Sequence, residues 1–320
     1  MLQWSESPPA GDFIRTHPLH PDDAPIVAAM RESTRPTKGA RLGIEARAMF
    51  DAAMEGILAP RGVTITPDAL GGIPGFWVSP KRWRPDEAII HLHGGWFNLG
   101  SARAFCHLAG HIASRADTRV FVPDYRLAPE HPFPAAPEDV LACYCGAAKK
   151  GVLQVGLTGD SAGGNLALGL ASRIAHETAS STTLVGVAVM SPVTDLTLSG
   201  ESYETRGDAD PLFTRQQVAA LVKAYLGDAD AAGPLASPLR SELSNLPPMR
   251  IHVGDSEVLL DDSVRYVEHA VAAGLDAKLD IWMGMPHGFP GSVGRLKAAD
   301  LTLDAIGSFL TASFRADAPS

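Results

Sequence analysis

The hydrophobic positions of this chain follow two spacings. Short apolar runs bounded by Gly or Pro predict strands, and between most of these runs apolar residues recur at helical spacing. The predicted strands cover residues 63–65, 75–78, 88–92, 119–122, 152–157, 185–189, 249–253 and 278–282. Helical patterns lie between later strands, at 103–115, 136–149 and 162–176. Strands that alternate with helices indicate a mostly parallel sheet covered on both faces, so we expect an α/β fold.

The turn after the fifth predicted strand carries the sequence Gly159-Asp160-Ser161-Ala162-Gly163. A strand pattern precedes it and a helical pattern follows, which is the setting of a nucleophilic serine on a tight strand-to-helix turn. Such a turn requires glycine on both sides of the serine because its backbone is crowded. This pattern is a known signature of α/β-hydrolases. The alternative is a glycine-rich turn whose serine only caps the following helix.

A serine nucleophile needs a general base, and the base needs an acid that orients it. In α/β-hydrolases the acid and the histidine follow the serine along the chain. Three histidines lie in the C-terminal region of this sequence. We choose His287, which stands in a loop rich in Gly and Pro after the last strand, whereas His252 lies in a strand and His269 on a helix.

Four carboxylates follow the seventh predicted strand, and each is a candidate for the orienting acid. They are Asp255, Glu257, Asp261 and Asp262. Asp261 and Asp262 are predicted to begin the next helix, where an acidic side chain stabilises the helix dipole for ordinary structural reasons. Asp255 and Glu257 therefore stay open as the acid.

The oxyanion of an acyl-transfer reaction needs backbone N–H groups that converge on one point. The segment His91–Phe97, at the end of the third predicted strand, is the expected place, because its consecutive glycines let the backbone approach a substrate. The N–H of Ala162, at the start of a helix, is directed at an oxyanion beside Ser161. A rival interpretation makes His91 and His93 zinc ligands, but no third ligand is evident in the sequence.

Two stretches break the alternation of strands and helices. Residues 1–48 are Pro-rich and then helical in pattern, without a strand signal, and predict a separate helical piece. Residues 194–246 also lack a strand pattern, and Thr214 precedes a predicted helix there. We expect a core of residues 49–193 and 247–320, with the two other stretches forming a lid over the serine. The alternative is an excursion far from the serine.

Four stretches resemble the hormone-sensitive-lipase family of carboxylesterases, in its bacterial branch. They are His93–Gly95, Asp124–Ala135, Gly159–Asn165 and Pro286–Phe289, and the resemblance extends from about residue 60 onward. It implies an α/β-hydrolase fold with an eight-stranded, mostly parallel sheet and a helical cap. The family's acid stands in an Asp-x-Leu-x-Asp pattern. Aligned on that pattern, Glu257 takes the acid position, 30 residues before His287.

The resemblance also implies the chemistry. Ser161, His287 and Glu257 would form a catalytic triad, and the N–H groups of Gly94, Gly95, Trp96 and Ala162 would stabilise the oxyanion. Trp96 departs from the family, which most often has a third glycine there, and its ring should narrow the range of substrates that fit.

We therefore expect a serine carboxylesterase that hydrolyses short- to medium-chain acyl esters, without a metal or an organic cofactor. Its partner would be a small-molecule ester, and homodimers are common in the family. One alternative is a lactone hydrolase that uses the same triad. The other is a non-catalytic receptor for small ligands, but such relatives lose the catalytic histidine, and His287 stands here in an intact loop.

Charge and composition narrow the choice of partners and location. The net charge of −9, without a visible Lys/Arg cluster, argues against nucleic acids and anionic membranes. The first residues lack the basic and apolar regions of a signal peptide, and no stretch approaches the ~20 apolar residues of a membrane span. The sparse cysteines (Cys106, Cys143 and Cys145) fit a reducing compartment. A cytoplasmic location is expected.

Overall fold

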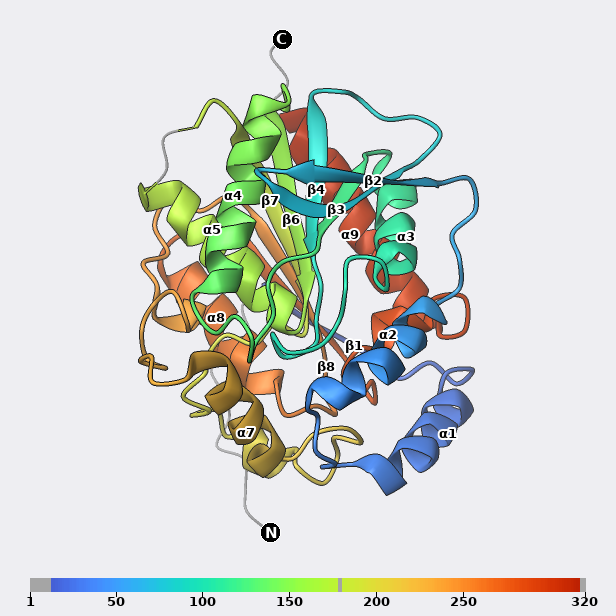
Figure 1. Cartoon of the computed structure of the whole chain (residues 1–320). Helices are drawn as coiled ribbons and strands as arrows, with labels where there is room; N and C mark the ends of the chain where they lie inside the picture. Colours follow the sequence, from blue (N-terminus) through green and yellow to red (C-terminus); the bar gives the residue numbers. More distant parts are fainter. Residues whose placement is uncertain (1–12, 178–179, 317–320) are drawn as a thin grey trace.

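A computed structural model describes residues 13–177 and 180–316, and its centre is a nine-stranded sheet (Figure 1). The strand order is β1-β9-β8-β7-β6-β4-β5-β3-β2. All neighbouring strands are parallel except the pairs β2–β3 and β3–β5. The strands are β1 (Ile14–His17), β2 (Thr64–Leu70), β3 (Ile73–Ser79), β4 (Glu87–Leu92), β5 (Val120–Pro123), β6 (Gln154–Asp160), β7 (Thr183–Met190), β8 (Met249–Gly254) and β9 (Ala277–Trp282).

Helices cover both faces of the sheet, as the apolar runs predicted. On one face lie α4 (Ala135–Lys149), α5 (Ala162–Glu177) and α8 (Leu260–Ala272), and on the other α3 (Cys106–Ala116) and α9 (Lys297–Ala316). Strand β4 places apolar side chains on both faces of the sheet: Ile90 belongs to the core under the first group of helices, and Ile89 to the core under the second. A strand buried on both faces cannot alternate apolar with polar residues.

The eight predicted strands are confirmed, and the first two pair antiparallel as expected. Strand β2 runs further than predicted, through Pro67. Proline lacks the N–H that a ladder needs, but β2 is the edge strand of the sheet, where proline is tolerated.

One expectation about the N-terminal stretch is wrong. Residues Ile14–His17 form a strand, β1, which pairs in parallel with β9. The His17 ring stacks on Trp282 at a centroid distance of 3.9 Å. Four residues beside Pro18 show too little alternation to be recognised, and their partner lies at the far end of the chain. After β1 the described residues carry helices joined by turns: α1 (Ala24–Thr34), the short helices η1 (Arg35–Thr37) and η2 (Ile44–Ala46), and α2 (Arg47–Glu55), which continues past residue 48.

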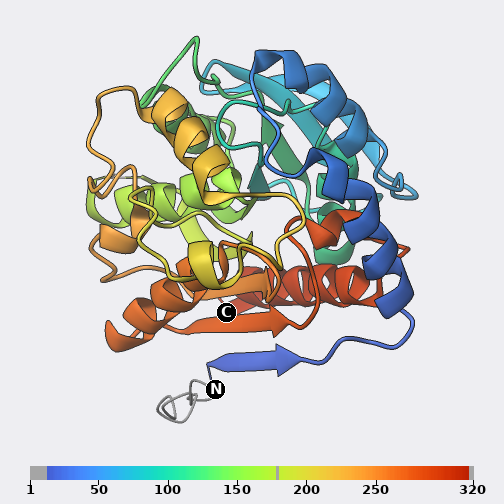
Figure 2. The same ribbon diagram turned by 90° about the horizontal axis from the view of Figure 1, so that it is seen from below.

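The stretch between β7 and β8 is described throughout and contains no strand. It carries α6 (Ser202–Thr205), α7 (Arg215–Leu226) and the short helix η3 (Pro238–Arg240). The Thr214 side chain accepts a hydrogen bond from the Gln217 N–H at 3.2 Å, so the predicted capped helix is confirmed. Helices α1, α2 and α7 gather at one end of the molecule (Figures 1 and 2).

Candidate active site

Ser161 stands alone between the end of β6 and the start of α5, with its backbone in the left-handed region at φ +56°. Its N–H donates to the Met190 carbonyl at 2.9 Å, which ties the turn to the end of β7. A Cβ on Gly163 would lie 1.8 Å from the Leu92 carbonyl oxygen, and one on Gly159 would lie 2.3 Å from the Gly163 oxygen. Both glycines are therefore required for steric reasons, as the motif predicted.

His287 lies against Glu257, with Nδ1 of the ring 2.6 Å from Oε2 of the carboxylate. Glu257 is fully buried, and the His287 side chain is 10% exposed. Because the carboxylate can only accept, Nδ1 carries the proton, and Nε2 is the nitrogen left for a substrate or a nucleophile. Burial lowers the pKa of His287, but the charge and hydrogen bond of Glu257 outweigh it, and the net shift raises that pKa.

A cavity of about 280 Å³ joins Ser161 to His287 and has mainly apolar walls. Helix α2 contributes Phe50 and Met54, and the stretch before α7 contributes Phe213. The remaining lining residues include Leu42, Ala53, Ile57, Gly95, Trp96, Leu99, Leu108, Asp160, Met190, Ser191, Leu212, Gly288, Pro290 and Gly291.

Two aromatic contacts shape this cavity near the histidine. The Phe213 ring meets His287 edge-on at a centroid distance of 5.2 Å. Trp96 meets Phe213 edge-on at 5.5 Å and is only 2% exposed. The Trp96 ring thus occupies space in the wall, as its bulk predicted.

The backbone after β4 turns through three consecutive left-handed residues, Gly95 (φ +117°), Trp96 (φ +52°) and Phe97 (φ +61°). In the described part of the chain, the N–H groups of Gly95, Trp96 and Ala162 donate to no protein acceptor. The N–H of Gly94 differs, because it donates to Oδ1 of Asp160 at 3.1 Å. Three of the four expected oxyanion donors therefore have no protein acceptor, and the fourth is engaged.

Helix α2 is held over the cavity by Arg47. Its guanidinium pairs with Glu130 at 2.7 Å and donates to the carbonyl oxygens of Asn98 at 2.8 Å and Ala128 at 2.9 Å. One side chain thus connects α2 to the loop after β4 and to the stretch 124–135. Within that stretch, the Tyr125 hydroxyl donates to the His93 carbonyl at 2.7 Å and so helps to hold the loop after β4 in place.

The comparisons with known proteins agree with this geometry. A family model of the alpha/beta hydrolase fold matches residues 89–291, more than half of the chain. A solved esterase from the bacterial hormone-sensitive lipase family superposes with a TM-score of 0.84 at 32% identity, over 92% of this chain and 98% of that chain. The chain belongs to the hormone-sensitive-lipase family of α/β-hydrolases.

Two similar proteins are named as ester-cleaving enzymes. An esterase of Acinetobacter venetianus is 36% identical over 230 residues, which cover 71% of this chain and 75% of the esterase. An acetyl-hydrolase of Streptomyces hygroscopicus is 34% identical over 247 residues, covering 75% of this chain and 80% of the relative. The protein is a carboxylic ester hydrolase, and the resemblance seen in its sequence is confirmed.

Asp255 and Glu257, the two candidates for the orienting acid, have different partners in the structure. Asp255 accepts from the Gly284 N–H at 2.6 Å and the Ser256 hydroxyl at 2.9 Å, so it braces the loop that leads to His287. Glu257, and not Asp255, contacts the imidazole.

The two histidines considered as zinc ligands have separate partners. His91 Nδ1 lies 3.0 Å from the Thr158 hydroxyl, and His93 Nδ1 lies 2.8 Å from the Gly94 carbonyl oxygen. Burial lowers the pKa of His91 to about 3 and that of His93 to about 4, so both rings are neutral. Among the described residues, no group of three or more His, Cys, Asp or Glu side chains is placed to hold a metal ion. No described helix is long and apolar enough to cross a membrane.

Sequence reasoning missed several polar residues around the site. Ser191, directly after β7, donates to Glu257, and Asp160 accepts from the Gly94 N–H. Asp261 and Asp262 do begin α8, but they also accept hydrogen bonds from backbone N–H groups of the stretch after β7. A helix-dipole role was therefore too narrow an interpretation of these two residues. Their partners are distant in the chain, so no local pattern could indicate them.

Proposed function

We propose that this hydrolase cleaves short- to medium-chain acyl esters through a triad of Ser161, His287 and Glu257. The observation that carries the proposal is the 2.6 Å contact between the His287 imidazole and the buried Glu257 carboxylate, at the edge of the cavity that contains Ser161. This contact orients the imidazole and leaves Nε2 available as a base, and His287 lines the same cavity as Ser161.

The reaction follows in two steps. Ser161 Oγ attacks the ester carbonyl while His287 Nε2 takes the hydroxyl proton, and the same nitrogen then gives that proton to the departing alcohol. Water attacks the resulting acyl-serine, again losing its proton to His287, and the acid leaves as the Ser161 oxygen regains a proton. Glu257 stays ionised throughout and stabilises the imidazolium.

We propose the N–H groups of Gly95, Trp96 and Ala162 as the oxyanion donors, each worth about 3 kcal/mol in the transition state. The N–H of Gly94 was expected among the donors. Its hydrogen bond to Asp160 instead supports a role in fixing the loop that presents the other donors.

The size and chemistry of the cavity support small acyl groups. Its volume of about 280 Å³ lies at the lower end of the range of small-molecule pockets, and apolar side chains dominate its walls. The relative named acetyl-hydrolase is consistent with a short acyl chain.

The test is a series of p-nitrophenyl esters, from acetate to dodecanoate, with wild type and Ser161→Ala. We expect turnover that depends on Ser161 and falls beyond medium-length chains. Activity retained by Ser161→Ala would contradict the triad. Turnover that rises up to dodecanoate would contradict the chain-length assignment, and faster hydrolysis of lactones than of matched open esters would make lactones the substrate class.

A further inference from the structure

Val258, the residue directly after Glu257, has both of its backbone polar groups bound by side chains from the stretch between β7 and β8. Its N–H donates to Oδ2 of Asp210 at 2.9 Å, and its carbonyl accepts from the Ser202 hydroxyl at 2.5 Å. All three residues are fully buried. Hydrogen bonds shielded from water in this way hold the backbone firmly, because breaking one leaves a buried polar group without a partner.

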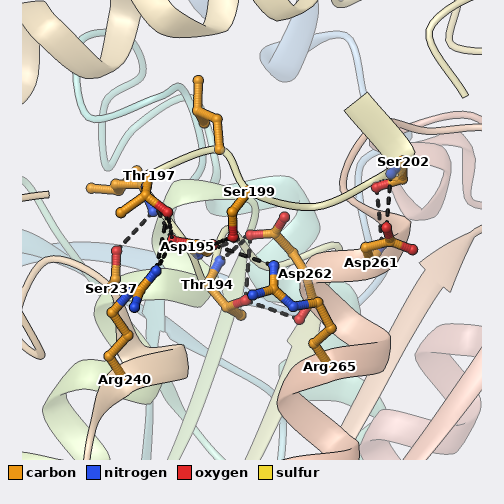
Figure 3. A network of polar contacts seen from close by, with 12 residues as sticks. Thr194, Asp195, Thr197, Ser199, Ser202, Ser237, Arg240, Asp261, Asp262 and Arg265 are labelled. Carbon is orange, nitrogen blue, oxygen red and sulfur yellow. Dashed lines mark hydrogen bonds and ion pairs between the residues drawn. The ribbon is translucent and has the colours of Figure 1, made fainter. Parts of the chain in front are cut away.

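Two further residues, Asp261 and Asp262 at the start of α8, also bind the stretch after β7 (Figure 3). Oδ2 of Asp261 accepts from the Ser202 N–H at 2.8 Å, and the Asp261 N–H donates to the Ser202 hydroxyl at 3.1 Å. Oδ1 of Asp262 accepts from the N–H groups of Thr194 at 2.6 Å and Asp195 at 2.9 Å. The loop that carries Glu257 is thus attached to residues 194–210 at several points.

Asp210 also fixes the wall of the cavity. Its second oxygen, Oδ1, accepts from the N–H groups of Leu212 at 2.8 Å and Phe213 at 2.9 Å. Phe213 in turn packs edge-on against His287. The buried Asp210 carboxylate therefore connects the cavity wall at Phe213 to the backbone of Val258, next to Glu257.

We infer that Asp210 and Ser202 are positioning residues for the catalytic acid, which they hold against His287 through the backbone of Val258. The inference rests on the proposed triad. It means that the stretch between β7 and β8 is part of the catalytic machinery as well as a cover, because the acid keeps its place only while this stretch is docked. Displacing a reacting group by about 1 Å costs as much as ~100-fold in rate, so small shifts here matter.

The acid limb of the pH profile of kcat can distinguish a misplaced Glu257 from a general loss of folding stability. Three acidic groups face His287 from different elements: Glu257 after β8, Asp210 after β7 and Asp160 at the end of β6. Each raises the pKa of His287 by its charge. Asp210→Asn would thus lower that pKa by loss of charge alone, whereas Ser202→Ala changes no charge and acts only if Glu257 moves.

The experiment compares Ser202→Ala and Asp210→Asn with Asp208→Asn, a matched control on an exposed neighbour. Enzyme is counted by active-site titration, kcat and KM for p-nitrophenyl acetate are measured from pH 5 to 9, and thermal unfolding is recorded. We expect Ser202→Ala to lower kcat roughly 10-fold, with little change in KM, and to move the acid limb to lower pH. Asp210→Asn should lower kcat further, and Asp208→Asn should match wild type.

Unchanged kcat and acid limb in Ser202→Ala, with only a lower melting temperature, would overturn the inference. If Asp210→Asn does not fold, Ser202→Ala alone decides. Glu257→Gln, measured in parallel, separates the two proposals. Wild-type turnover in Glu257→Gln would overturn both the triad and this inference. If Glu257→Gln loses turnover while Ser202→Ala keeps the wild-type kcat and acid limb, only the positioning role of Ser202 and Asp210 is overturned.

Discussion

The Ser191 hydroxyl donates to Oε1 of Glu257 at 2.7 Å, on the oxygen opposite the one that faces His287. The N–H of Gly254 donates to the same Oε1 at 2.6 Å. Ser191 itself is held at φ +45°, with its N–H bonded to the His252 carbonyl at 2.7 Å. A fully buried carboxylate is costly unless donors surround it, and here both of its oxygens are satisfied.

Removal of this hydroxyl should weaken catalysis. A hydrogen bond to a charged group is worth about 1.5–3 kcal/mol, so we expect Ser191→Ala to lower kcat/KM by roughly 10-fold or more. Because Glu257 raises the pKa of His287, a less firmly held carboxylate should move the acid limb of the pH profile to lower pH. Ser256→Ala is the matched control, since the Ser256 hydroxyl binds Asp255. Equal profiles for the two variants would contradict the role of Ser191.

The assignment of the acid can be tested by two amide substitutions. Glu257→Gln should reduce kcat by about 10⁴, because the amide neither orients the imidazole in the right tautomer nor stabilises its charged form. Asp255→Asn should cost far less in turnover, since an amide oxygen can still accept from the Gly284 N–H. The kcat of both variants is measured with p-nitrophenyl acetate. If only Asp255→Asn loses turnover, Asp255 and not Glu257 is the orienting acid.

The Trp96 ring should limit the substrates that fit. Trp96→Gly removes a buried ring from the cavity wall, and glycine readily adopts the positive φ of this position, so the backbone can stay in place. A methylene in an apolar pocket is worth about 1–3 kcal/mol, so the ratio of kcat/KM for octanoate over acetate should rise roughly 10-fold. Trp83→Ala, on an exposed tryptophan, serves as the control. An unchanged ratio would show that the ring does not limit chain length.

Asp262 should make the stability of the protein depend on pH. Burial raises its pKa from 3.8 to about 7, so the folded state binds a proton that the unfolded state has released between these values. Stability therefore falls as pH rises through this window. Asp262→Asn cannot titrate, and its melting temperature relative to wild type should improve from pH 5 to pH 8. Asp160, whose pKa burial also raises to about 7, contributes equally to both proteins. A constant difference at the two pH values would refute this role of Asp262.

Much of the fold could be predicted because its signals are local. Five consecutive residues are enough to predict strand β4. The turn at Ser161 is predicted by the glycines at 159 and 163, where neighbouring backbone atoms leave no room for a side chain. The loop of His287 was found by its Gly and Pro content. Strand β1 was missed, since four residues carry almost no periodicity and gain their structure from β9.

The sequence by itself indicated eight of the nine strands, the turn at Ser161 and the loop of His287, because steric and hydrophobic patterns act over short distances. Local patterns left Asp255 and Glu257 open, the family pattern indicated Glu257, and packing places Glu257 against His287. Only the tertiary structure showed that the Gly94 N–H is bound by Asp160. It also brought Ser191 and Asp210 to the acid loop from 66 and 48 residues away. Side chains separated this far in the chain meet only through packing, and no spacing in the sequence encodes which oxygen accepts which proton.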